Sequence, residues 1–461
     1  MQLVWFRNDL RLEDNPSVHA AIQSNGPVIL LYILDERAGA ASRWWLHHSL
    51  TSLVREINER GGRLILRRGD PLKVIPALVK DHDVMAVHAA RAYEPFWRVT
   101  DRKLDAALKT LGCAFYRHLS TSLFAPERIT TQAGKLFGVY TPFSKACFAA
   151  GIPAVYLPAP GNLVSPEIES EPLTAWRLLP TKPDWASGLR AEWTPGEAGA
   201  RARLDVFLSG PVHHYHKTRD FPAQPGTSKL SPHIHFGEIS PRLVWHRAQV
   251  ADESEGVKTF LKELLWREFS LNQLWQYPTL RTQPIREEFS GFGWRKNNAW
   301  LTAWQRGNTG IPIVDAGMRE LWQTGWMHNR VRMICASYLV KHLLIPWQEG
   351  EQWFWETLCE ADEAANGASW QWVAGCGADA APYFRIFNPV LQGQKFDPEG
   401  IYVRRFVPEL GTLPGSHIHT PWEAPESLRV GLNYPAPLVL PEAGRQAALA
   451  AYKDLQSKVR R

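Results

Sequence analysis

The sequence predicts an α/β domain with a doubly wound parallel sheet, followed by a mostly α-helical domain. Up to about residue 120, short apolar runs of strand length alternate with amphipathic segments of helical period. Such alternation is typical of parallel sheets with helices on both faces. From about residue 201 onward the helical period dominates. Between these halves, prolines from Pro153 to Pro195 interrupt the periodicity, so we expect domains at 1–125 and 201–461 joined by a connector at 126–200.

The first half is expected to contain five strands, each a short apolar run. These runs lie at 3–6, 28–34, 64–68, 84–88 and 114–118. Helices are expected between the strands, near 16–24, 42–60, 71–81 and 96–111. Sheets of this kind bind ligands beyond the strand ends where the strand order reverses. No GxGxxG motif follows the first strand, which argues against a standard dinucleotide site there.

Ser-Pro pairs mark helix starts in the second half. In Ser231-Pro232 and Ser240-Pro241 we expect serine as the N-cap and proline as the first helical residue. The apolar period also predicts long helical segments over 258–275 and 313–344.

Composition excludes several classes of protein. The chain has 461 residues, of which 45% are hydrophobic and 21% charged, so it can bury large cores. Its apolar runs are too short to cross a membrane, and no signal peptide precedes the first strand, so no membrane partner is expected. Five scattered cysteines without a CxxC pair indicate a reducing compartment and argue against a disulfide framework or zinc.

Charge and aromatic content are compatible with nucleic-acid binding. The net charge is +6, the isoelectric point is about 9.0, and the chain contains 21 tryptophans. The neighbouring histidines His213, His214 and His216 are interpreted as part of a solvated loop, and no metal site is expected.

The segment 360–389, EADEAANGASWQWVAGCGADAAPYFRIFNP, is the most informative part of the chain. It combines two carboxylates, an asparagine and a Trp-Gln-Trp in a run that is poor in leucine and valine. Such a segment would form a weak core helix. We interpret it as the wall of a pocket for a flat, redox-active group.

Five motifs, in the same order, resemble those of the photolyase/cryptochrome flavoproteins, and most closely those of class I cyclobutane pyrimidine dimer photolyases. They are LVWFRNDLRLEDNP at 3–16, GTSKLSPHIHFGEISPR at 226–242, ELLWREF at 263–269, GWMHNRVRMICASYLVKHLL at 325–344, and the 360–389 segment. The resemblance spans essentially the whole chain. It implies FAD bound in a U-shape in the helical domain and active as the reduced anion. It also implies a carbon–carbon lyase that uses blue light to drive an electron from the flavin into a DNA lesion.

The resemblance assigns the flavin site residue by residue. The matching residues are Tyr215, Thr227, Ser228, Lys229, Leu230, Ser231, Phe260, Arg267, Arg332, Glu360, Ala361, Asp362 and Asn366. The hydroxyl-rich turn at 227–231 suits a pyrophosphate at a helix start, although a plain capped helix would show the same pattern. Arginine suits an anionic flavin because it does not deprotonate. Glu360, where the family usually has aspartate, is expected to form a salt bridge with Arg332.

Asn366 matches the residue that faces flavin N5, where an amide can donate or accept a hydrogen bond. Related photoreceptors tend to carry aspartate or cysteine there, so Asn366 favours repair. A cryptochrome-type blue-light photoreceptor is the first alternative, and a light-independent flavoprotein or DNA-binding module is the second. Three further residues, Trp370, Trp347 and Trp294, match the family's electron-transfer chain from flavin to surface, whereas core packing is the ordinary role of a tryptophan.

The lesion site must receive a dimer that has been flipped out of the duplex. The residues matched to it are the walls Trp266 and Trp372, the apolar contact Met333, and the polar readers Glu263 and Asn329. Glu263, Trp266 and Arg267 would share one helix face. The (6-4) enzymes of the family use a histidine pair at the lesion, so asparagine and methionine here favour the cyclobutane dimer. Arg219, Arg330 and Lys395 are the expected contacts to DNA phosphates.

A second, antenna chromophore is common in the family. In its folate-binding members an Asn-Glu pair follows the fourth strand, but here Phe96-Trp97 stand near that place, which argues against folate. A deazaflavin, a second flavin or no antenna stay open. The expected partner is UV-damaged DNA, and the expected state is a monomer. We expect the protein in the cytoplasm, associated with the nucleoid when bound to DNA, or in the nucleus if the source is eukaryotic.

Overall fold

The computed structural model describes residues 1–153, 156–383 and 385–459. Its N-terminal part contains a parallel sheet of five strands in the order β3-β2-β1-β4-β5. The strands are β1 (Gln2–Phe6), β2 (Val28–Ile33), β3 (Leu64–Arg67), β4 (Ala86–Ala90) and β5 (Ala114–His118). The order reverses between β1 and β4, as in a doubly wound sheet. The fold class predicted for this half is therefore confirmed.

Helices cover both faces of the sheet because successive side chains of a strand point to opposite sides. They are α1 (Pro16–Ile22), α2 (Ala40–Asn58), α3 (Pro71–Asp81) and α4 (Pro95–Thr110). Val4 and Phe6 join a core cluster with residues of α1 and α2. Leu3 and Trp5, which alternate with them, join a second cluster with residues of α3 and α4. Strand β1 is thus buried on both faces, which accounts for its continuous apolar run.

The connector is not a free linker. It contains α5 (Tyr140–Ala150), α6 (Ser187–Glu192) and two short 3-10 turns (Pro126–Arg128 and Leu173–Trp176). Leu163, Trp176, Leu189 and Trp193 of this segment are buried in the core that lies against α2. The connector therefore completes the α/β domain as well as leading away from it.

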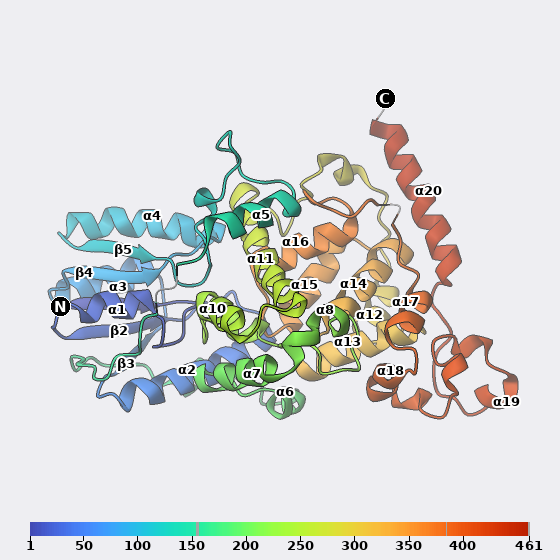
Figure 1. Ribbon diagram of the computed structural model, residues 1–461, viewed down its shortest axis with the longest axis horizontal. Coiled ribbons are helices and arrows are strands. Elements are labelled where there is room, and N and C mark those ends of the chain that lie inside the picture. The colour runs from blue at the N-terminus through green and yellow to red at the C-terminus, as the bar shows by residue number, and fades with distance from the viewer. Residues whose placement is uncertain (154–155, 384, 460–461) are drawn as a thin grey trace.

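In the described residues of the second half, the regular elements are all helices. Its α-helices are α7 (Glu197–Ser209), α8 (Tyr215–Thr218), α9 (Ser231–His235), α10 (Pro241–Ala251), α11 (Glu255–Gln276), α12 (Asn298–Gln305), α13 (Pro312–Thr324), α14 (Asn329–Ser337), α15 (Trp347–Thr357), α16 (Glu363–Ala374), α17 (Pro389–Phe396), α18 (Ile401–Phe406), α19 (Glu426–Arg429) and α20 (Pro441–Val459). Figure 1 shows the sheet at one end of the molecule and α20, with the C-terminus, at the other.

Two local predictions differ from the structure. The expected continuous segment over 313–344 is divided, because α13 ends at Gly325 in the left-handed conformation (φ +66°) and α14 begins after the cap His328. A π-helical turn, Tyr338–His342, then follows α14. Ser231 is not an N-cap but the first residue of α9. Ser240, by contrast, accepts a hydrogen bond from the Leu243 backbone N–H at 2.9 Å, so its predicted cap is confirmed.

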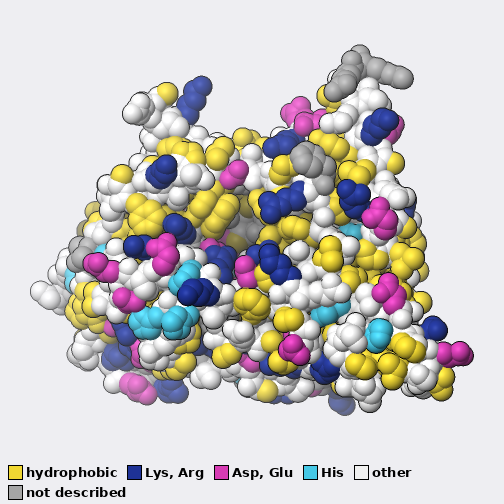
Figure 2. All heavy atoms as spheres, turned by 45° about the vertical axis from the view of Figure 1, so that its right-hand side comes forward, with side chains coloured by type: hydrophobic (Ala, Val, Ile, Leu, Met, Phe, Trp, Pro, Cys, Tyr) yellow, Lys and Arg dark blue, Asp and Glu magenta, His cyan; other side chains and the backbone are white. Residues whose placement is uncertain are grey.

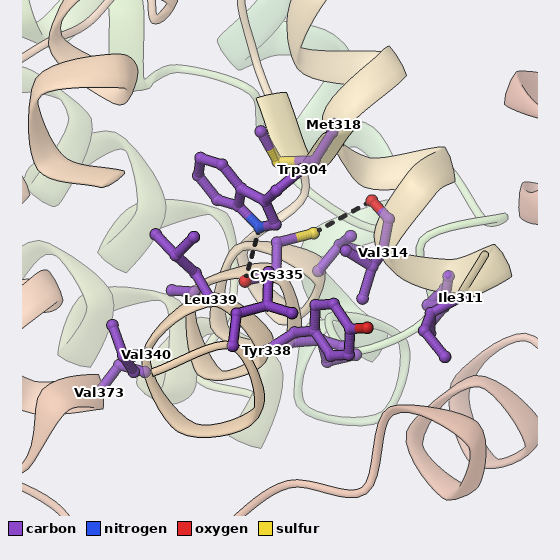
Figure 3. Close-up of a cluster of buried hydrophobic side chains, with 14 of the residues drawn as sticks. Trp304, Ile311, Val314, Met318, Cys335, Tyr338, Leu339, Val340 and Val373 are labelled. Carbon is purple, nitrogen blue, oxygen red and sulfur yellow. Dashed lines mark hydrogen bonds between the residues drawn. The ribbon is translucent and has the colours of Figure 1, made fainter. Parts of the chain in front are cut away.

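A buried cluster anchors α14 and α16 to the rest of the helical domain. Figure 3 shows Trp304, which donates its indole N–H to the carbonyl of Cys335 at 3.0 Å. The Cys335 thiol in turn donates to the carbonyl of Val314 on α13. Val373 of α16 lies in the same cluster. These contacts hold the helices whose other faces line the cavity described next.

Among the described residues, every helix is too short or too polar to span a bilayer.

Candidate functional site

A cavity of about 570 Å³ lies within the helical domain. That volume is within the range of small-molecule sites. The predicted residues that line it are Tyr215, Arg219, Thr227, Ser228, Lys229, Leu230, Ser231, Phe260, Glu263, Trp266, Arg267, Asn329, Arg330, Arg332, Met333, Glu360, Asp362, Asn366, Trp370 and Trp372. Figure 2 shows a face of the molecule that is hollowed near its middle, with charged side chains beside the hollow.

One face of α11 forms a wall of the cavity. Glu263, Trp266 and Arg267 line it together, as their spacing predicts. Ser270 and Gln273 also line it, although sequence reasoning missed both. Their spacing continues the same helix face toward the C-terminus of α11, so the periodic signal was sufficient to find them.

The segment before α9 has a backbone suited to an anion. Lys229 has a positive φ of +49°, and Leu230 follows in the right-handed region. A left-handed residue next to a right-handed one aligns consecutive N–H groups into an anion-binding concavity. The Lys229 ammonium lies 2.8 Å from Glu192 Oε1, so its charge is partly neutralised. The backbone and the hydroxyls of Thr227 and Ser228 are therefore the groups that fit a pyrophosphate.

An ion pair between Arg332 and Glu360 adjoins the turn at 227–231. Arg332 Nη2 is 2.5 Å from Glu360 Oε1, so the predicted salt bridge is present. The Ser231 hydroxyl donates to the same oxygen at 3.3 Å, whereas Glu360 Oε2 is buried without a hydrogen-bond partner in the described residues. A buried carboxylate oxygen without a partner is costly. It fits a bound group that donates a hydrogen bond, as the hydroxyls of FAD do.

Asp362 combines two tasks. Its Oδ1 accepts the backbone N–H of Ala365 at 2.7 Å and caps α16. Its Oδ2 lies 3.7 Å from Nδ1 of His235, a cavity residue that sequence reasoning missed. Burial alone would raise the pKa of Asp362, but His235 and the charge of Arg267 lower it to about 2. Asp362 is therefore ionised and fixed in place.

Asn366 is held in one orientation. Its amide nitrogen donates to the carbonyl of Glu351 at 3.0 Å and to Glu351 Oε1 at 2.8 Å. Glu351 is itself paired with Arg281 at 2.6 Å. Because both amide protons are engaged, the group that Asn366 offers to the cavity is its carbonyl oxygen, a hydrogen-bond acceptor.

The wall residue Trp266 is supported from behind by Tyr140 of α5. The two rings are stacked with centroids 3.6 Å apart and planes within 5°. The Tyr140 hydroxyl donates to the carbonyl of Lys262 at 2.6 Å. Tyr140 lies in the connector and was not predicted, because nothing local in the sequence pairs it with α11. Trp372 of α16 also lines the cavity and is half-buried.

Two of the arginines that are expected to contact DNA phosphates form ion pairs at the cavity. Arg219 is paired with Glu263. Arg330 lies 2.9 Å from Asp220. Burial raises the pKa of Glu263, and the charge of Arg219 offsets part of that shift. Of the three expected phosphate contacts, Lys395 is exposed on α17, outside the cavity, and has no ion-pair partner in the described residues.

The three matched tryptophans differ in their burial and in whether they line the cavity. Trp370 lines the cavity and is 2% exposed, Trp347 at the start of α15 is 1% exposed, and Trp294 is half-buried. A Cβ built on Gly350 would fall 2.1 Å from the Trp370 ring, so that ring lies directly on the backbone of α15. Ala361, the other matched residue outside the lining, is buried in the core of the helical domain.

Comparison with known proteins gives matches over nearly the whole chain. The DNA photolyase family model matches residues 2–161, and the model for the FAD binding domain of DNA photolyase matches residues 260–454. The deoxyribodipyrimidine photo-lyase of Agrobacterium fabrum is 47% identical over 98% of this chain and 97% of its own. Cryptochrome-1 of Arabidopsis thaliana is 36% identical over 95% of this chain and 68% of its own. The crystal structure of a class III photolyase from Agrobacterium tumefaciens has a TM-score of 0.96 and 46% identity, covering 99% of this chain and 98% of that one.

Proposed function

This chain belongs to the photolyase/cryptochrome family, and on that premise we propose that it is a deoxyribodipyrimidine photo-lyase that repairs UV-damaged DNA. The main observation behind the proposal is that the groups suited to the cofactor and those suited to the lesion line the same cavity. One cavity brings together an anion-binding turn, the Arg332–Glu360 pair and the aromatic walls Trp266 and Trp372. Such a chamber has groups suited to a cofactor and others suited to a flipped-out pyrimidine dimer.

The FAD-binding domain has the groups that the cofactor requires. Bound FAD supplies, in its reduced form, the electron that light drives into the lesion. The turn at 227–231 would hold the pyrophosphate, while Arg267 and Arg332 would balance the negative charge of the ring. Asn366, with its amide protons engaged, would accept a hydrogen bond from a ring N–H.

Recognition of the lesion would rest on flat walls and a few polar groups. Trp266, backed by Tyr140, and Trp372 would contact the faces of the dimer, and Met333 would add a soft apolar contact. Glu263 and Asn329 would bind the base edges. Because burial raises the pKa of Glu263, a bound dimer that separates it from Arg219 would favour its neutral, hydrogen-bond-donating form.

We further propose that the protein is a class III enzyme. The motifs suggested class I, but the solved structure at 46% identity is that of a class III photolyase. A photoreceptor role is less well supported, since the identity to the plant cryptochrome is 36% against 47% to the photo-lyase. Cyclobutane pyrimidine dimers are the proposed substrate, because the lesion wall carries Asn329 and Met333.

Illumination of the purified holoprotein tests the proposal. The protein is mixed with an oligonucleotide that contains one cyclobutane dimer, under reducing conditions, and dimer loss is measured by chromatography. Loss in blue light and none in the dark is expected. A flavin-loaded protein that binds the oligonucleotide but leaves the dimer intact in light would contradict repair and favour the photoreceptor.

A further inference from the structure

A second pocket, of about 360 Å³, lies where the α/β domain meets the end of α11. Its lining is strongly basic and partly apolar. The residues are Arg91, Ala92, Pro95, Arg98, Val99, Asp101, Arg102, Arg117, Trp275 and Pro278. The lining of this pocket shares no residue with that of the cavity described above, although Gln273 of that cavity lies two residues before Trp275 on α11. The two are therefore distinct pockets.

The positive charge of the pocket is only partly compensated. Asp101, its one acidic residue, is 3% exposed and bound to Arg7. Arg91 pairs with Glu127 at 2.6 Å. Arg102 and Arg117 are exposed and have no ion-pair or hydrogen-bond partner among the described residues.

The remaining cation, Arg98, lies close to other positive charges and is held in place by Trp275. Burial and the charges of Arg102 and Arg91 lower its pKa. Its guanidinium carbon nevertheless stays 3.8 Å from the centre of the Trp275 ring, and the group donates to the Trp275 carbonyl at 3.3 Å. Arg91 lies over the same ring at 5.6 Å. The fold thus holds two guanidinium groups near each other without an internal anion to bind them both.

We propose that this pocket binds a nucleoside diphosphate. The planar guanidinium fork matches phosphate oxygens in pairs, and Arg102 and Arg117 are the groups free to make those bonds. The first turn of α4, which begins at Pro95, adds its positive end to the same place. Pro95, Val99 and Pro278 provide an apolar side for the base. A volume of about 360 Å³ exceeds the needs of one phosphate and falls among small-molecule sites.

The test is calorimetric titration of the FAD-loaded full chain with ADP. The variant Arg102→Ala/Arg117→Ala removes the two free guanidinium groups. Arg55→Ala/Arg63→Ala, on the exposed surface of the same domain, removes the same charge elsewhere and is the control. We expect the pocket variant to bind ADP about tenfold more weakly or worse, since hydrogen bonds to charged groups are the strong ones, and the control to match wild type. Both should repair dimers normally.

Several outcomes would overturn the proposal. They are no ADP binding by wild type, an equal loss in both variants, or full affinity in the pocket variant. Displacement of ADP by undamaged duplex DNA from wild type would instead identify a DNA-backbone site. Val99→Trp is the second variant, because it fills the pocket from an exposed helix position without changing charge. It should abolish ADP binding while FAD content stays normal.

Discussion

Glu360 departs from the family pattern and still forms the expected ion pair with Arg332. The family usually has aspartate at this position, yet the longer glutamate still reaches Arg332 at 2.5 Å and Ser231 at 3.3 Å. Its second oxygen is left buried without a protein partner. That oxygen is a free acceptor at the cavity, available to a bound group that donates a hydrogen bond.

Glu263 is the residue on which lesion recognition should depend most directly. We expect Glu263→Ala to lower lesion affinity or repair yield about tenfold, the scale of one hydrogen bond to a charged group. FAD content should stay normal, because the flavin groups lie elsewhere in the cavity. Repair and binding are measured beside Glu255→Ala, an exposed residue of the same helix. Equal repair by Glu263→Ala and wild type would remove Glu263 from the site.

Trp370 is the proposed first member of the tryptophan chain. Replacement by phenylalanine keeps an apolar ring but raises the energy of oxidising it. We expect light-driven reduction of the purified holoprotein to slow at least about tenfold. Dimer repair by chemically reduced protein should be preserved. The change is followed by flavin absorbance, with Trp185→Phe in the α/β core region as control. Undiminished photoreduction would exclude Trp370 from the path.

At the scale of elements, α15 and α16 pack so closely that adding one methyl group at Gly350 should disturb their contact. A Cβ on Gly350 would meet the Trp370 ring at 2.1 Å. We expect Gly350→Ala to destabilise the protein by about 1–3 kcal/mol, as overpacking does, and to disturb photoreduction as well. Thermal unfolding measures the first effect. Gly415→Ala, where an added Cβ meets nothing within 4 Å, should leave both unchanged.

Asp362, the N-cap of α16, should make the stability of the folded protein depend on pH in the acidic range. The pKa of Asp362 in the folded protein is about 2, below its unfolded value, so its contribution is complete above about pH 4 and is lost as pH falls toward 2. The shift corresponds to about 2 kcal/mol. Asp362→Asn keeps an oxygen to cap the helix but does not titrate. We expect the stability difference between wild type and this variant to shrink from pH 5 to pH 2 in thermal unfolding, and parallel curves would contradict the assignment.

At the scale of the molecule, the net charge of +6 should govern DNA binding. Affinity for lesion-containing duplex should fall steeply with salt, because phosphate contacts release counterions. Lys395 is exposed and has no ion pair in the described residues, so Lys395→Ala should reduce the salt slope by roughly one unit. Arg219→Ala should change lesion affinity more than the salt slope, since Arg219 is paired with Glu263. Fluorescence anisotropy over a salt series measures both slopes, and identical slopes for Lys395→Ala and wild type would reject that contact.

The elements of the α/β half followed from sequence nearly to their ends, whereas the site did so only in part. A strand between two helical layers must be apolar on both faces, so β1 and β2 can be predicted from their own residues. The matched motifs likewise supplied about half of the residues that line the cavity. They did not indicate Tyr140, His235 or the pairing of Arg219 with Glu263, because each of these depends on a partner from a distant segment.

Periodicity predicted the strands and helices of the α/β half, and the motifs predicted which side chains lie together at the cavity. Tertiary packing alone decided where α13 stops, which oxygen of Glu360 is free, how Asn366 is turned, and that four arginines converge beside Trp275. The physical reason is the sequence separation of the interacting groups. The burial of one face of a helix or strand follows from the residue pattern of that element alone. These hydrogen bonds and ion pairs form only when segments far apart in the chain come within a few ångströms of each other.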